Sequence, residues 1–242
     1  MEITSLTNAK VKQWVKYKEK KQRDLEQKFL IEGEHLLQEA HKAHLVETII
    51  IEQGHLNPYP NIESYEVTPE IMKKISESVS GTYIIGICNY PTYDTSEVGH
   101  KIIVLDDVQD PGNVGTIIRS ALSFGYDSVL LSEHSVDVYN QKLIRSTQGA
   151  LFHIRIMRGN ILALIKDLQI KGISIYATSL HQATPLQEVQ KTDNFALVFG
   201  NEGKGVSNQV LDIANERVYI EMDTFESLNV AVAAGICMYY FK

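Results

Sequence analysis

Three polar segments of this 242-residue chain carry residue types and spacings that could do chemistry. In the first, residues 110–121, Asp-Pro-Gly-Asn leads into an apolar helical pattern, and Asn113 is a candidate cap of that helix. The free N–H groups of a helix N-terminus bind anions such as phosphate. Arg119 lies about 9 Å further along the helix axis, and helical side chains lean toward the N-terminus. The segment therefore predicts an anion site that Arg119 can reach.

The second segment is a glycine-rich turn after an apolar strand, Gly-Asn-Glu-Gly-Lys-Gly at residues 200–205. Glycines permit positive φ and a close approach of backbone to a ligand. Gly200 and Gly205 have the separation of a phosphate-binding P-loop, but Val206 stands where that loop requires lysine. The G-x-G-x-x-G dinucleotide fingerprint is also missing after the strand expected at 101–106. The turn therefore argues against nucleotide hydrolysis and against dinucleotide binding.

The third segment, residues 220–238, ends a polar turn in Ser-Leu-Asn and continues into a pattern that is apolar on every side. Ser227 is a natural N-cap for a helix over 228–241. Because that helix has almost no charge, we expect it to be buried. Its small residues let other backbone come close. A polar turn against so apolar a helix suggests a site built from backbone groups.

The charge of the chain is unevenly distributed. The formal net charge is −7, yet residues 10–28 carry +5, which leaves −12 on the remainder. A basic arm on an acidic body is the electrostatic pattern of a polyanion-binding protein; a solvated helix face is the other interpretation. The predicted RNA-contacting residues of the arm are Lys10, Lys12, Lys16, Lys20, Lys21 and Arg23.

Bulk properties exclude several classes of protein. No apolar run approaches the roughly 20 residues of a membrane span, and no apolar signal region begins the chain, so we expect a cytoplasmic protein without a membrane partner. Cys88 and Cys237 lie in apolar surroundings and are expected to be buried thiols. The histidines show no metal-ligand spacing, and the acids Asp106, Asp107 and Asp110 are expected to form a solvated loop.

The hydrophobic pattern predicts two α/β domains joined by a linker. Residues 1–88 form the first, with helices expected at 7–22, 33–43 and 69–78 and strands at 29–31, 48–51 and 83–88. Residues 89–100 are rich in turn formers and are expected to be the linker. Residues 101–242 form the second. Its expected strands are 101–106, 128–131, 153–157, 173–178, 195–199 and 217–220, and its expected helices are 114–124, 139–146, 160–170, 207–213 and 228–241. Apolar strands alternating with helices imply a mostly parallel, doubly wound sheet.

In this order and spacing the three segments closely resemble the motifs of the SpoU/TrmH family of RNA ribose 2′-O-methyltransferases, over residues 101–242. Residues 29–34, Phe-Leu-Ile-Glu-Gly-Glu, resemble the opening of the ribosomal-protein-like RNA-binding domain that precedes many members. The resemblance implies S-adenosylmethionine as cofactor and a ribose 2′-hydroxyl of rRNA or tRNA as acceptor, with no metal. It also implies a C-terminal trefoil knot and a homodimer in which the second subunit completes the active site.

The same resemblance assigns residue roles. The matching catalytic positions are Arg119, Asn113, Glu202, Ser227 and Asn229, and the matching cofactor positions are Thr178, Ser179, Gly200, Ile220 and Leu228. A guanidinium is essentially never deprotonated in a protein. We therefore expect Arg119 to clamp the target phosphate and to stabilise charge on the 2′-oxygen, not to act as a base. For Ser227 and Asn229, capping of the last helix is the alternative role.

Two other functions stay open at this point. A non-catalytic RNA-binding protein could retain the fold, although the five catalytic positions argue against that. A small-molecule methyltransferase would leave the basic arm without a role. The family's first domain usually closes with Gln-Gly before its last strand, whereas residues 80–83 here read Ser-Gly-Thr-Tyr. This departure leaves the identity of the RNA undetermined.

Overall fold

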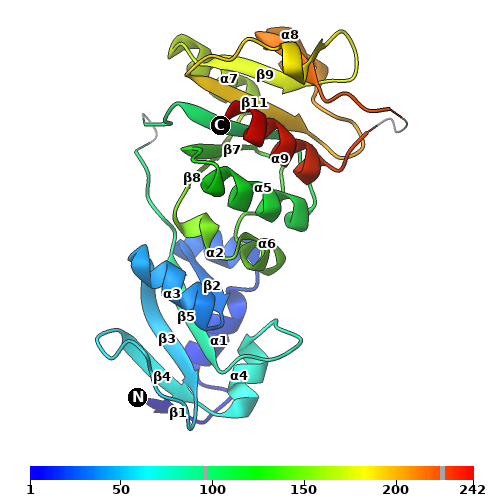
Figure 1. The fold of residues 1–242 in the computed structure, drawn as a ribbon. Coiled ribbons are helices and arrows are strands. Elements are labelled where there is room, and N and C mark those ends of the chain that lie inside the picture. Colours follow the sequence, from blue (N-terminus) through cyan, green and yellow to red (C-terminus); the bar gives the residue numbers. More distant parts are fainter. Residues whose placement is uncertain (95–96, 224–226) are drawn as a thin grey trace. The chain divides into compact units, whose positions relative to one another are not determined.

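The computed structural model describes residues 1–94, 97–223 and 227–242, which fold as two compact units (Figure 1). The first unit comprises Met1–Thr92 and Tyr139–Phe152, and the second comprises Tyr93–Val138 and His153–Lys242. Part of the expected linker (residues 95–96) and part of the third polar segment (residues 224–226) lie outside the described residues.

The first unit is built around a mixed sheet of order β1-β4-β3-β5-β2. Its elements are β1 (Glu2–Ile3), α1 (Ala9–Lys16), α2 (Lys20–Glu26), β2 (Lys28–Glu32), α3 (Glu34–Lys42), β3 (Val46–Glu52), β4 (Glu63–Val67), α4 (Pro69–Ile75), β5 (Ile84–Asn89), α6 (Gln141–Thr147) and the 3-10 turn η1 (Ala150–Phe152). The short strands β1 and β4 were not expected from the sequence. Glu32, the glutamate of the Glu-Gly pair that follows the Phe-Leu-Ile strand, has a structural role. Buried Glu32 accepts hydrogen bonds from the Ser76 hydroxyl (2.6 Å) and from the backbone N–H groups of Glu77 (2.7 Å) and Ser78 (3.1 Å).

The basic arm is two helices and not the single helix expected over 7–22. The chain leaves α1 at Tyr17, and Glu19 is extended before α2 begins. Arg23 explains the break, because its guanidinium donates to the carbonyl groups of Tyr17 (2.8 Å) and Lys18 (2.7 Å), which the end of α1 leaves without helical partners. Arg23 is accordingly only 5% exposed.

The segment Tyr139–Phe152 packs in the first unit, although the sequence pattern places it within 101–242. The Tyr139 ring lies 4.6 Å from Phe29 and stacks at 3.9 Å on Tyr90. Buried Gln141 donates to the Leu30 carbonyl oxygen (2.8 Å). Tertiary packing thus assigns to the first unit a helix that sequence position alone assigns to the second.

The second unit holds a fully parallel sheet of order β10-β12-β9-β11-β6-β7-β8. Its elements are β6 (Lys101–Asp106), α5 (Pro111–Ser123), β7 (Ser128–Ser132), β8 (Arg155–Gly159), α7 (Ile161–Ile170), β9 (Ser174–Thr178), β10 (Thr184–Pro185), the 3-10 turn η2 (Leu186–Glu188), β11 (Phe195–Gly200), α8 (Asn208–Ile213), β12 (Glu216–Tyr219) and α9 (Val230–Phe241). Helices α5 and α9 pack against each other on one face and α7 and α8 on the other (Figure 1). The expected parallel α/β fold is confirmed.

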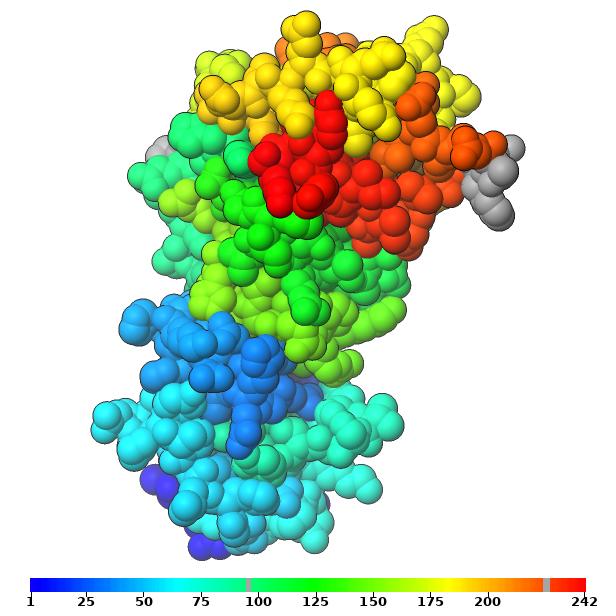
Figure 2. All heavy atoms as spheres, viewed as in Figure 1, coloured from blue at the N-terminus to red at the C-terminus, as the bar shows by residue number. Residues whose placement is uncertain are grey.

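Helix α9 is buried on one side only, contrary to the expectation that it would be enclosed. Ala234 and Met238 face the core. Val232, Ile236 and Tyr239 are 51%, 40% and 61% exposed, and their spacing places them on one helical face. This helix lies at the surface in Figure 2, where it is red.

Both thiols are buried as expected, and burial raises the pKa of Cys237 to about 12. Among the described residues no helix is long and apolar enough to cross a membrane.

Candidate functional site

The candidate site lies at the point in the parallel sheet where the order of strand addition reverses, between β6 and β11. Strands β6, β7 and β8 run outward in chain order to one edge, whereas β11 pairs with β6 on its other side. Gly200 at the end of β11 lies opposite Asp106 at the end of β6. In open parallel sheets the carboxyl ends of strands at such a switch point form the usual ligand crevice. The first polar segment follows shortly after the end of β6, and the second begins at the end of β11.

The Glu202 carboxylate joins the two loops. Its Oε2 accepts the backbone N–H of Gln109 (3.2 Å), and its Oε1 accepts the backbone N–H of Asp110 (3.1 Å) and the Asn113 side-chain amide (3.1 Å). Asn113 Oδ1 in turn accepts the Asn229 amide (3.1 Å). Glu202, Asn113 and Asn229, which are far apart in sequence, therefore form one hydrogen-bonded chain, as expected of residues that share a site.

The helix caps differ from those expected. Asp110, and not Asn113, caps α5, because its carboxylate accepts the N–H of Asn113 (2.9 Å) and Pro111 occupies the first helical position. Asn229, and not Ser227, caps α9 by accepting the N–H groups of Ala231 (2.9 Å) and Val232 (3.3 Å). With its oxygen engaged in the cap, Asn229 turns its amide toward Asn113.

The hydrogen bonds around Glu202 set its charge. Burial by itself raises the pKa of this carboxyl, but its own backbone N–H, that of Asp110, the Asn113 amide and the N–H of Gln109 outweigh burial and lower the pKa below its ordinary value of 4.5. Glu202 is therefore ionised at neutral pH and acts as a fixed hydrogen-bond acceptor.

The strand-end acids do not form the solvated loop that we expected. Asp106 is buried and accepts the N–H of Ser207 (2.8 Å), where α8 begins. Asp107 has a φ of +58° and accepts a hydrogen bond from Ser132. Asn201, which sequence reasoning missed, donates to the Asp107 carbonyl oxygen (2.9 Å). An asparagine beside a glycine turn was the available signal for this second link between the loops.

Gly200 is required by space. A Cβ atom at this position would lie 2.0 Å from the carbonyl carbon of Gly205 and 2.0 Å from the nitrogen of Val206. The turn folds back on its own strand in this way because Asn201 and Gly205 form a β-bridge. Only a residue without a Cβ atom lets the backbone of Gly205 and Val206 pack this closely against the end of β11.

Four of the five expected cofactor residues lie at the ends of three neighbouring strands, β12, β9 and β11, and the fifth, Leu228, lies just before α9. The Thr178 hydroxyl donates to the Val198 carbonyl (3.0 Å), and the Ser179 N–H donates to the Val218 carbonyl (3.0 Å), so the end of β9 is fixed to both neighbours. Ile220 follows β12 directly.

Two leucines among or next to the expected cofactor residues are exposed. Leu228 is 37% exposed, and Leu180, which follows the expected pair in sequence and was not foreseen, is 55% exposed. Exposed apolar side chains can cover a purine, and a glycine such as Gly200 permits a close approach to main-chain groups. No metal-binding cluster of histidine, cysteine or acidic side chains occurs within residues 1–94, 97–223 and 227–242.

Two expected catalytic residues lie outside the hydrogen-bonded chain. Arg119 is exposed on α5, beyond the turn that carries Asn113, and its guanidinium has no hydrogen bond or ion pair with any described residue. Ser227 is exposed just before the α9 cap. Both side chains are therefore available to a substrate.

Comparison with known proteins identifies the family. The model of the SpoU rRNA Methylase family matches residues 100–239, and that of the MRM3-like substrate binding domain matches residues 8–86. The 23S rRNA (guanosine(2553)-2′-O)-methyltransferase RlmP of Bacillus subtilis (strain 168) is 37% identical over 246 residues, which cover 100% of this chain and 99% of that protein.

Solved structures agree. The AdoMet-bound rRNA methyltransferase from Sinorhizobium meliloti superposes with a TM-score of 0.88 and 27% identity, covering 99% of this chain and 96% of that one. AviRb, a SpoU methyltransferase from Streptomyces viridochromogenes crystallised with AdoMet, has the same fold, with a TM-score of 0.87, 23% identity and 96% coverage of both chains.

The chain belongs to the SpoU rRNA methylase family, as the three polar segments predicted. It is an RNA 2′-O-methyltransferase, and S-adenosylmethionine is its cofactor. None of these relatives supports the non-catalytic alternative.

The space around Gly200 generates a stability prediction. Gly200→Ala should lower the free energy of unfolding by about 1–3 kcal/mol, because the added carbon overlaps backbone that must move. Gly203→Ala is the matched control in the same turn, since its Cβ would meet only Asn201 Oδ1 at 3.7 Å. Urea unfolding of the three proteins measures both effects, and equal midpoints for the two variants would contradict the packing argument.

The lowered pKa of Glu202 generates a pH prediction. A carboxyl whose folded pKa is depressed stabilises the protein above its ordinary pKa of 4.5, and this stabilisation is lost as pH falls through the folded value. Wild type should therefore exceed Glu202→Gln in urea midpoint at pH 7, and the difference should shrink below pH 4.5. Glu188→Gln, an exposed change in the same unit, controls for the lost charge. A difference that did not change with pH would show that the ionised carboxylate is not responsible.

Proposed function

We propose that this enzyme methylates a guanosine ribose of 23S rRNA. The observation that carries the proposal is the full-length similarity to RlmP of Bacillus subtilis, whose name specifies that reaction. The hydrogen-bonded chain of Glu202, Asn113 and Asn229 supports it, because the residues that the reaction needs are assembled and not merely present in the sequence. Methylation of a tRNA ribose is the competing outcome of the experiment below.

The chain's own residues divide the chemistry among them. S-adenosylmethionine supplies an electrophilic methyl group when bound. Thr178, Ser179, Gly200, Ile220 and Leu228 are the residues that would hold it. Ionised Glu202 fixes the Asn113 amide, and Asn229 fixes its oxygen, so that the α5 N-terminus has one orientation. Such positioning can contribute about 7–11 kcal/mol when reactants are well aligned.

Arg119 is the proposed phosphate clamp. Its guanidinium stays protonated and has no described protein partner to compete with an RNA phosphate. From α5 it would also stabilise negative charge as the 2′-hydroxyl loses its proton. Ser227 precedes the α9 cap and is proposed as a further polar contact at the transfer site.

The RNA-contacting surface is proposed to include the basic arm, with one correction. Lys12, Lys16 and Lys21 are exposed and have no ion pair with any described residue. Lys10 lies over the Tyr65 ring at 4.4 Å, and Lys20 pairs with Asp24, yet both remain exposed. Buried Arg23 is committed to backbone carbonyls, so we omit it from the RNA-contacting set.

A homodimer is proposed from the exposed face of α9. Val232, Ile236 and Tyr239 form an apolar face on an uncharged helix, and such faces mark association surfaces. This helix is capped by Asn229, so a second subunit seated on it would lie next to the site.

Three further expectations are kept as proposals. Residues 1–88 are the RNA-binding domain, 89–100 the linker and 101–242 the methyltransferase domain, of which Tyr139–Phe152 pack in the first unit. The end of the chain passes through a trefoil knot, which the position of β11 between β6 and β9 supports. The enzyme works in the cytoplasm, where its RNA is.

The function is tested with radiolabelled S-adenosylmethionine. Purified enzyme and total RNA from a strain lacking it should give label in 23S rRNA, recovered as 2′-O-methylguanosine. Arg119→Ala should lower the rate on the order of 10²-fold or more while cofactor binding, measured by calorimetry, is retained. Arg217→Ala, which removes an arginine paired with Asp212, is the matched control. Label in tRNA would replace the proposed substrate, and near-wild-type turnover of Arg119→Ala would remove Arg119 from the mechanism.

The dimer is tested by charge placed on the α9 face. Ile236→Asp should convert the protein to a monomer in sedimentation velocity at micromolar concentration, because a buried unpaired carboxylate opposes association. Ile170→Asp, on the exposed face of α7, should leave the assembly unchanged. A wild-type monomer, or a dimer that tolerates Ile236→Asp, would contradict the proposed interface.

A further inference from the structure

The loop between β6 and α5 has a backbone shape that requires support. Asp107 at its start adopts a φ of +58°, a left-handed conformation that costs energy for any residue with a Cβ, although aspartate tolerates it better than most. This turn directs the next N–H groups of the loop, those of Gln109 and Asp110, at the Glu202 carboxylate. The geometry of the hydrogen-bonded chain of Glu202, Asn113 and Asn229 therefore depends on the contacts that keep Asp107 in this conformation.

The loop after β7, residues 132–136, keeps Asp107 in its left-handed conformation. The Ser132 hydroxyl accepts the Asp107 N–H (2.9 Å) and donates to the Asp107 carboxylate. It is also within 2.9 Å of the Ser135 hydroxyl, and the Val136 N–H donates to the Val108 carbonyl (3.0 Å). The side chain of Gln109 donates to the His134 carbonyl. Residues 132–136 thus contact Asp107, Val108 and Gln109, the residues of the β6 loop before the α5 cap.

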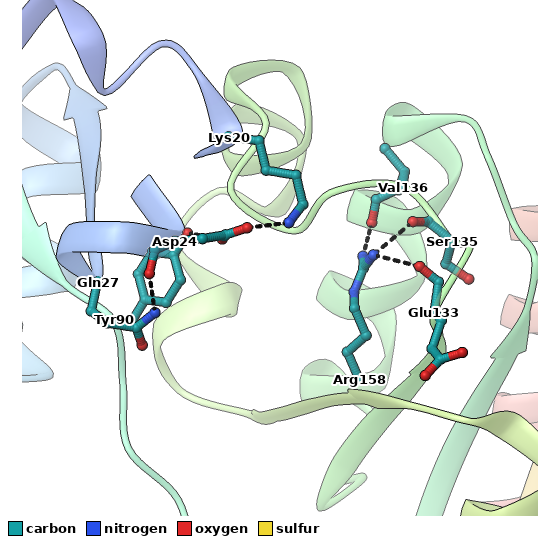
Figure 3. Close-up of polar contacts among 8 residues, drawn as sticks. All are labelled: Lys20, Asp24, Gln27, Tyr90, Glu133, Ser135, Val136 and Arg158. Carbon is teal, nitrogen blue, oxygen red and sulfur yellow. Dashed lines mark hydrogen bonds and ion pairs between the residues drawn. The ribbon is translucent and has the colours of Figure 1, made fainter. Parts of the chain in front are cut away.

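Arg158, near the end of β8, closes this second loop from the other side. One guanidinium nitrogen donates to the carbonyl oxygens of Glu133 (3.2 Å) and Ser135 (2.9 Å), and the other donates to Val136 (Figure 3). Three convergent carbonyl groups would repel one another without a cation between them. A planar, permanently charged fork is the side chain that satisfies them together.

We propose that Arg158 and Ser132 are positioning residues for methyl transfer. Arg158 fixes the loop 133–136, this loop and Ser132 fix the left-handed turn at Asp107, and the turn presents two N–H groups to Glu202. Glu202 then orients Asn113 and, through it, Asn229. The proposal rests on the proposed function for its kinetic consequence, whereas the structural relay stands without it.

Simpler roles for these residues predict different results. A surface arginine that binds RNA would have a free guanidinium, but that of Arg158 is occupied by three carbonyl groups. A residue that only stabilises the fold would change the unfolding midpoint without changing turnover per folded molecule. A positioning residue should slow the chemical step and leave cofactor binding unchanged, since three of the five proposed cofactor residues, Thr178, Ser179 and Ile220, lie at the ends of β9 and β12, across β11 from β7 and β8.

The test compares two arginines of the same strand. Arg158→Ala should lower the single-turnover rate on the RNA substrate about tenfold or more, with the dissociation constant for S-adenosylmethionine unchanged. Arg155→Ala, which removes a surface ion pair with Glu97, should leave that rate within about twofold. Amide hydrogen exchange followed by mass spectrometry, without RNA, should show faster exchange over residues 107–113 in Arg158→Ala only.

A second pair of variants keeps the proposal testable if Arg158→Ala folds poorly. Asp107→Asn retains an oxygen for Ser132 and tolerates the left-handed turn, so it should behave as wild type. Asp107→Ala loses both and should reproduce slow transfer and fast exchange.

Each outcome decides one question. Equal amide exchange over residues 107–113 in the Arg158→Ala and Arg155→Ala proteins would overturn the relay. Slow methyl transfer by Arg158→Ala without faster exchange would also overturn it, and would indicate that Arg158 acts on RNA. If wild type fails to methylate the RNA, the proposed substrate is wrong and the exchange data still decide the relay.

Discussion

The acceptance of three N–H groups by one carboxylate is the interaction on which the site depends. Glu202 lies on a turn after β11, and its partners lie on the loop after β6 and on the first turn of α5. Asn201, which donates to the Asp107 carbonyl oxygen, and Asp106, which accepts the Ser207 N–H, are further links across the switch point. Because the backbone and amide donors lower the pKa of Glu202, its link persists as an ionised, charge-assisted contact at neutral pH.

Different strand ends along the carboxyl edge of the sheet carry residues with different proposed roles. The ends of β8 and β7 support the loop geometry through Arg158 and Ser132. The loops after β6 and β11 are joined by the Glu202 hydrogen bonds, and the ends of β11, β9 and β12 carry four of the five proposed cofactor residues. A parallel sheet permits this division because all its strands end at the same edge, and the switch point opens the crevice in the middle.

Helix α9 combines two requirements that usually conflict. Its inner face needs small and apolar residues to pack on α5 and β11, and its outer face is also apolar and exposed. On a helix at the protein surface the outer face usually carries polar residues. Asn229 connects these features to the site, because the same side chain caps the helix and contacts Asn113.

The sequence by itself determined the parallel α/β class, most elements of the second unit and the three polar segments from which the proposed site residues come. Local signals suffice for these, since periodicity marks strands and helices and the glycine and Asp-Pro patterns mark turns. The sequence did not determine which polar residue caps each helix. Ser227 and Asn229 are both good caps locally, and only the contact with Asn113 explains the use of Asn229.

Burial and long-range pairing were decided by the tertiary structure. In the sequence Arg23 looks like any other cation of the basic arm. In the structure its guanidinium donates to two backbone carbonyl groups at the break between α1 and α2. Asp107 and Arg158 have no local pattern that distinguishes them from surface residues. Their roles arise from contacts between loops that the sheet order brings together, and sheet order is a property of the whole chain that no single segment encodes.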